Sequence, residues 1–152
     1  MGDPTLRAQV RAEMTAALRA GDKVRLGALR MLSAAITNRE KEVLHELDDD
    51  EVREVAAKEV KRRAESIEAF DSAGRTDLAD KERAEREALL PFAPEQLTDA
   101  EVDALIDQTI SSTGATSMAD MGRVMGAVMA TARGRADGSV VQAKVRERLS
   151  AS

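Results

Sequence analysis

The chain has 152 residues, with 23 Lys and Arg against 28 Asp and Glu, and a formal net charge of −5 at pH 7. General nucleic-acid binders are strongly basic, so this composition argues against that class. The chain has no Cys, which excludes disulfides and thiolate chemistry, and neither Trp nor Tyr, so aliphatic side chains and Met must form the core. No run approaches the ~20 apolar residues of a membrane span, and the N-terminus lacks the apolar segment of a signal peptide. We therefore expect a cytoplasmic protein with no membrane partner.

Apolar residues at helical spacing predict an all-α first domain over residues 1–93. Its first helix is expected to open at Asp3, with Pro4 in the first turn, where proline is favoured. The segments 22–46 and 48–73 each carry a helical pattern of about 25 residues, a length that predicts an extended hairpin rather than a globule. The first domain is thus predicted to be an extended helical one.

A fourth helix is expected after Gly74, with Thr76 as its cap. The mixed charge run at residues 80–87 within it is interpreted as a solvated face with internal ion pairs. Pro91 and Pro94 should prevent any helix from continuing, and the domain boundary is placed there.

Residues 94–152 are predicted to form a second, three-helix bundle. Thr98 and Glu101 have the spacing of a capping box, and Ser117 with Asp120 is a weaker version of it. The last helix is predicted from apolar residues four apart, namely Val141, Val145 and Leu149. No segment alternates with period two, so no sheet is expected.

The middle helix of this bundle has a methionine stripe and two internal glycines. The stripe is interpreted as core, and an adaptable binding groove is the alternative. Gly122 and Gly126 each cost roughly 1 kcal/mol of helix propensity relative to Ala. We expect these structural glycines to allow close approach of a neighbouring helix, with Gly126 buried there. The stripe consists of Met118, Met121, Met125 and Met129.

The turn Arg133-Gly134-Arg135 is the strongest candidate for a functional site. Two guanidiniums on a tight turn can grip phosphates, and Gly134 lets a backbone come close. Lys144 and Arg148, four apart on the last helix, would extend this surface. From residue 111 onward the chain has six Lys and Arg and three acidic residues. The resulting local charge of +3 favours an anionic partner.

The sequence offers little for catalysis or for binding a metal or cofactor. His45 is the only histidine and lies at a helix end, where a surface role is favoured over that of a catalytic base. The acids 48–51 are contiguous and no glycine follows them, which is typical of a helix start rather than of a calcium loop. We predict no catalytic residue, no metal site and no cofactor.

Several runs are shared with a known family. In the C-terminal part they are Gly126-Ala127-Val128-Met129, Arg133-Gly134-Arg135-Ala136-Asp137 and Val140-Val141. In the N-terminal part they include Glu59-Val60-Lys61-Arg62-Arg63, Ser66-Ile67-Glu68 and Ala73-Gly74-Arg75-Thr76-Asp77-Leu78. These runs resemble the GatB/YqeY family, which comprises the helical tail of the B subunit of the tRNA-dependent amidotransferase and its free-standing relatives. The resemblance covers nearly the whole chain.

The amidotransferase tail helps to hold tRNA, so the resemblance implies tRNA, aminoacyl-tRNA or the amidotransferase machinery as candidate partners. It also favours a nucleic-acid contact through Arg133, Arg135, Lys144 and Arg148. The chain departs from the tail pattern at Ala130 and Ser139, which align with lysines there, and at Asp137, which aligns with an uncharged residue.

A non-catalytic accessory role is the favoured hypothesis. One alternative is a protein–protein interaction module that uses the long acidic N-terminal helices. A second is the carbon–nitrogen ligase activity of the relatives, with glutamine as amido-N-donor. No nucleophile or phosphate-activating site is visible that would support this activity.

Overall fold

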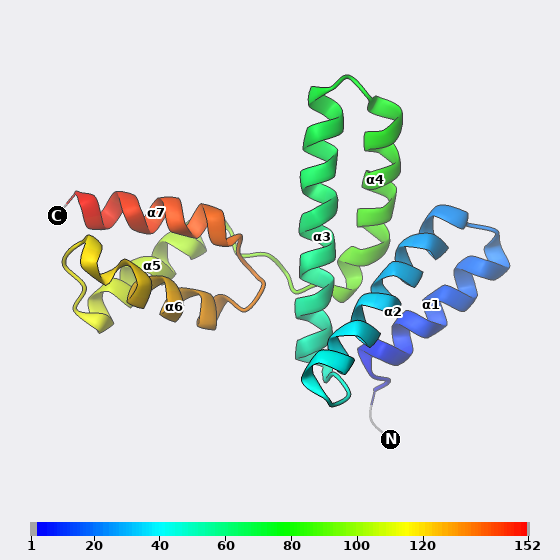
Figure 1. The fold of residues 1–152 in the computed structure, drawn as a ribbon, viewed down its shortest axis with the longest axis horizontal. Coiled ribbons are helices and arrows are strands. Elements are labelled where there is room, and N and C mark those ends of the chain that lie inside the picture. The colour runs from blue at the N-terminus through cyan, green and yellow to red at the C-terminus, as the bar shows by residue number, and fades with distance from the viewer. Residues whose placement is uncertain (1–2, 152) are drawn as a thin grey trace. The chain divides into compact units, whose positions relative to one another are not determined.

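The computed structural model describes residues 3–151, and these form helices with no strand among them (Figure 1). The predicted all-α class is confirmed. The helices are α1 (Leu6–Ala20), α2 (Lys23–Val43), α3 (Asp49–Ser72), α4 (Thr76–Leu89), α5 (Asp99–Thr113), α6 (Met121–Ala132) and α7 (Gly138–Ser150), with short 3-10 helices at Leu90–Phe92 and Met118–Asp120. The chain divides into two compact units, an N-terminal unit that ends at Pro94 and a C-terminal unit that begins at Glu95.

Short polar side chains set the start of the first and third helices. Thr5 caps α1, because its hydroxyl accepts a hydrogen bond from the Ala8 amide. The prediction that α1 opens at Asp3 is therefore wrong, because the cap is Thr5 and the first helical residue is Leu6. Asp48 begins α3 in a capping box with Glu51, which agrees with the interpretation of this acidic run as a helix start.

The turn between α3 and α4 depends on Gly74, whose φ of 71° lies in the left-handed region that favours glycine. Arg75 occupies the cap position of α4 without a side-chain capping bond, and Thr76 is already the first helical residue. The prediction that Thr76 caps this helix is wrong.

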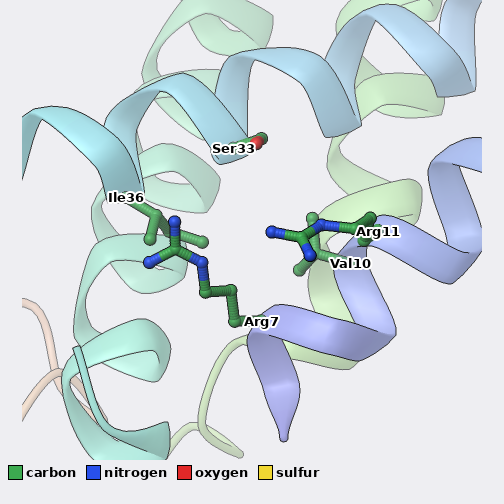
Figure 2. Close-up of a pocket in the computed structure, with 5 residues that line it drawn as sticks. All are labelled: Arg7, Val10, Arg11, Ser33 and Ile36. Atoms are coloured by element: carbon green, nitrogen blue, oxygen red, sulfur yellow. The ribbon is translucent and has the colours of Figure 1, made fainter. Parts of the chain in front are cut away.

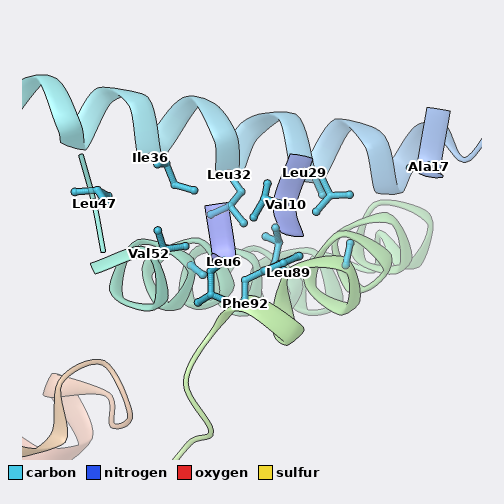
Figure 3. Close-up of a cluster of buried hydrophobic side chains, with 13 residues drawn as sticks. Leu6, Val10, Ala17, Leu29, Leu32, Ile36, Leu47, Val52, Leu89 and Phe92 are labelled. Atoms are coloured by element: carbon cyan, nitrogen blue, oxygen red, sulfur yellow. The ribbon is translucent and has the colours of Figure 1, made fainter. Parts of the chain in front are cut away.

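The core of the N-terminal unit lies where α2 packs against α1, α3 and α4. Phe92 is 3 % exposed, because the 3-10 turn around Pro91 folds its ring onto this core. The proline-containing segment thus completes the first unit before the chain leaves it. The largest side chains of the core, shown in Figure 3, include Leu29, Leu32, Ile36, Val52, Leu89 and Phe92.

The C-terminal unit packs α5, α6 and α7 around valines and isoleucines. The predicted capping box at the start of α5 is confirmed, since the Glu101 amide donates to the Thr98 hydroxyl and the Thr98 amide donates to the Glu101 carboxylate, both at 3.1 Å. The predicted inner face of α7 is also buried. The fully or nearly buried residues of this core include Val102, Ile106, Val124, Val128, Val141, Val145 and Leu149.

The methionines of α6 lie beside this core. Val124 and Val128 form the centre of the helix's inner face, with no exposed surface. Three methionines are partly buried against it, which favours the core interpretation for them, whereas Met118 is 42 % exposed. The three are Met121, Met125 and Met129.

The glycines of α6 do not pack as expected. Gly122 and Gly126 are exposed, and a Cβ built at either position would have no side-chain or neighbouring-helix atom within 4 Å. The prediction that Gly126 is buried against another helix of the bundle is wrong. Their low helix propensity is therefore not offset by close packing inside this unit.

Candidate nucleic-acid interface

The candidate site begins where α6 ends, in the basic turn formed by residues 133–137. Arg133 takes a left-handed conformation with φ 40°, and its amide donates to the Met129 carbonyl. Gly134 follows with φ 80°, a conformation that glycine adopts without the cost that a Cβ imposes. The two left-handed residues end the helix and place the exposed side chain of Arg133 at the surface.

Three hydrogen bonds brace this basic turn against the first residues of the C-terminal unit. The Leu97 amide donates to the Arg135 carbonyl at 2.8 Å, and the Gln96 side chain donates to the Gly134 carbonyl at 3.0 Å. The Arg135 Nε donates to the Glu95 carbonyl at 2.9 Å. The turn is therefore fixed by contacts across about forty residues of sequence. Arg135 is half-buried, whereas Arg133 is exposed.

Lys144 and Arg148 face α5. Lys144 Nζ lies 2.9 Å and Arg148 Nη2 3.1 Å from the same oxygen of Asp103, and Arg148 Nε lies 2.7 Å from Asp107. Hydrogen bonds from Lys144 and then Arg148 hold the pKa of Asp103 below its ordinary value, and Asp103 raises the pKa of Lys144. These two cations would have to exchange protein carboxylates for phosphates in order to bind RNA.

Helix α5 also changes the charge balance of the candidate surface. Residues 95–152 carry six Lys and Arg but eight Asp and Glu, so the C-terminal unit has a net charge of −2. The local charge of +3 counted from residue 111 leaves out the acids of α5, which lie against α7. Hydrogen bonds from Thr98 lower the pKa of Glu101, and the charge of Arg135 lowers it further. The surface is one of mixed charge, and Arg133 and Arg135 are the cations of its basic turn.

The other polar candidates have structural contacts. His45 is exposed, with Nδ1 2.8 Å from the Glu46 carbonyl oxygen and Nε2 3.5 Å from Glu51. An oxygen of Asp49 accepts a hydrogen bond from the Leu6 amide at 2.9 Å and so ties the start of α3 to the start of α1. Within residues 3–151, no group of three or more His, Asp or Glu side chains is placed to hold a metal ion.

The sequence patterns did not predict the buried ion-pair network that lies between α3 and α4. The side chain of Arg63 is 2 % exposed, donates to the Glu59 carboxylate and lies 3.5 Å from Glu85, which is 13 % exposed. Burial raises the pKa of Glu82, and the charge of Glu85 adds to this effect, while Arg63 opposes it. The run 80–87, interpreted as a solvated face, therefore places Glu85 against a buried guanidinium.

A family model described as Yqey-like protein matches residues 7–149. The protein named "Altered inheritance of mitochondria protein 41, mitochondrial", from Pyrenophora tritici-repentis (strain Pt-1C-BFP), is 30% identical over 99 residues, which are 64% of this chain and 55% of that protein. The chain thus spans about half the length of this curated relative. Among the described helices, none is long and apolar enough to cross a membrane.

Proposed function

The chain belongs to the Yqey-like protein family, and from this premise we propose that it is a non-catalytic accessory protein that contacts tRNA through the basic turn. The observation that carries the proposal is the brace at residues 95–97, which holds Arg133 and Arg135 on a rigid turn. A rigid turn loses little conformational entropy when it binds, which favours even a small contact. The choice of tRNA follows the resemblance of this run to the amidotransferase tail.

The proposed contact is small. Arg133 and Arg135 can bind about two phosphates, and Lys144 and Arg148 add little while Asp103 and Asp107 hold them. Each phosphate contact contributes about −0.7 to −0.9 to the slope of log affinity against log salt concentration. Two contacts therefore predict a slope of about −1.5, whereas four contacts would give a slope of roughly −3.

Such a contact suits an accessory protein in a larger assembly. A unit with a net charge of −2 attracts RNA weakly by itself. If the N-terminal unit binds a protein of the tRNA-charging or amidotransferase machinery, the basic turn meets tRNA at a high effective concentration. We propose the cytoplasm as the place of this assembly.

Binding of the full chain to tRNA, measured by fluorescence anisotropy over a salt series, tests the proposal. Replacing Arg133 and Arg135 together with Gln should abolish most of the binding and flatten the salt slope. Arg146→Gln is the matched control, because Arg146 is an exposed cation on α7 outside the basic turn. Unchanged binding by the double variant, or an equal loss in the control, would remove the basic turn from the interface.

A protein–protein interaction module without nucleic-acid binding is the second candidate function. The pairing of Lys144 and Arg148 with acids of α5 favours it, because this pairing neutralises the surface that RNA would need. Absence of tRNA binding by the wild-type chain at low salt, together with specific recovery of a protein partner on the immobilised full chain, would establish this function instead.

A further inference from the structure

A small pocket lies between α1 and α2 in the N-terminal unit, and none of the residues discussed for tRNA lines it. Helix α1 contributes Arg7, Val10 and Arg11 to its lining, and helix α2 contributes Ser33 and Ile36. In Figure 2 the Arg11 guanidinium extends toward the Arg7 side chain, the Arg7 guanidinium is turned toward Ile36, and Ser33 lies above the space between the two arginines. Two cations, a hydroxyl and two apolar side chains thus line one space.

The charges around this pocket are incompletely balanced. Arg7 pairs with Glu40, and that carboxylate also accepts a hydrogen bond from the Leu47 amide at 3.0 Å. The hydrogen bond from the Leu47 amide lowers the pKa of Glu40 most, and the hydrogen bond from Arg7 lowers it further. The Glu40 carboxylate therefore already has two hydrogen-bond partners. The guanidinium of Arg11 has no ion-pair or hydrogen-bond partner within residues 3–151. Like charges four residues apart on a helix repel, and an anion between them would remove the repulsion.

We propose that this pocket binds a phosphate group, which Arg7, Arg11 and Ser33 hold from three directions. Guanidinium groups form strong, directional hydrogen bonds to phosphate oxygens, and a hydroxyl can donate a further one. The oxygens of a tetrahedral anion point in several directions toward all three donors, whereas the acceptor sites of a carboxylate lie in one plane. Val10 and Ile36 reduce the local dielectric constant and strengthen these bonds.

Titration of the full chain with inorganic phosphate at low ionic strength tests the proposal. Calorimetry gives the affinity, and amide shifts at Arg11 and Ser33 in two-dimensional NMR spectra locate the binding. Arg11→Gln should weaken phosphate binding at least tenfold and leave the fold intact, because Arg11 is exposed and lacks a partner within the described residues. Ser33→Ala should weaken it about three- to tenfold, which corresponds to one hydrogen bond.

The matched control is Arg30→Gln, which removes an exposed cation of α2 that does not line the pocket. It should bind phosphate as the wild type does. An equal loss in this control, no shifts at the pocket, or acetate binding as tight as phosphate would each overturn the proposal.

Phosphoserine as a second probe distinguishes the source of the group. Binding of phosphoserine with an affinity similar to that of inorganic phosphate supports a pocket that accepts a phosphate carried by a small molecule. Binding of inorganic phosphate alone supports a site for the free ion.

Discussion

Replacing Arg63 with Met tests the energetic role of the buried network between α3 and α4. Met keeps an apolar stem of comparable length but removes the charge, so Glu59 and Glu85 lose their buried partner. Removing one member of a buried ion pair costs about 3–5 kcal/mol. Arg62 remains 3.6 Å from Glu59, which limits the loss, and we therefore expect about 3 kcal/mol, the lower end of that range.

The same variant should show a characteristic dependence on pH. Arg63 lowers the pKa of Glu82 against the effect of burial, so its removal raises that pKa further. The folded variant then binds a proton at a pH where the unfolded chain does not, and its stability increases as pH falls through the raised pKa. The stability gap between the variant and the wild type should narrow as the pH falls through the raised pKa of Glu82 toward the ordinary pKa of a glutamate.

Urea unfolding followed by NMR measures this loss for each unit separately. Amide signals of α3 report on the N-terminal unit and those of α6 on the C-terminal unit, because the chain has no Trp or Tyr as an optical probe. The control Arg62→Met removes a neighbouring cation that is 67 % exposed and should change stability by less than about 0.5 kcal/mol. A loss below about 1 kcal/mol in Arg63→Met, or an equal loss in the control, would refute the reasoning.

Three further predictions concern the C-terminal unit and the absence of catalysis. Gly126→Ala should raise the unfolding free energy by up to about 1 kcal/mol, because Gly126 is exposed within α6; a decrease in urea unfolding would contradict this. Thr98→Ala should lower it by about 1 kcal/mol by removing the cap of α5, and unchanged stability would contradict that. The purified chain should release no ammonia from glutamine, and turnover that survives removal of contaminating amidotransferase would contradict a non-catalytic role.

Local chemistry made much of the fold predictable from the sequence. The buried positions of α7, Val141, Val145 and Leu149, follow from a spacing of four along one face of a helix. The capping box of Thr98 and Glu101 depends only on residues three apart. Such features need no knowledge of the rest of the chain.

The errors about the charged residues came from contacts between distant residues. Asp103 and Lys144 are 41 residues apart, and no local pattern shows that α5 directs its acids toward the cations of α7. Arg63 and Glu85 lie on separate helices in charged runs that, taken singly, are typical of solvent-facing surfaces. At Gly126 the low helix propensity suggested a packing contact, yet propensity alone does not say whether a neighbour is present.

The brace between residues 95–97 and the basic turn also affects where the chain can be lengthened or divided. A fragment that begins at Thr98 would keep α5, α6 and α7 but lose the three hydrogen bonds that fix the orientation of Arg135. Extra residues inserted before Glu95 leave the brace in place, whereas residues inserted between Glu95 and Leu97 shift its donors and acceptors out of register. Residues 95–97 thus both connect to the first unit and support the basic turn, so a change of linker length should preserve the turn only on the N-terminal side of Glu95.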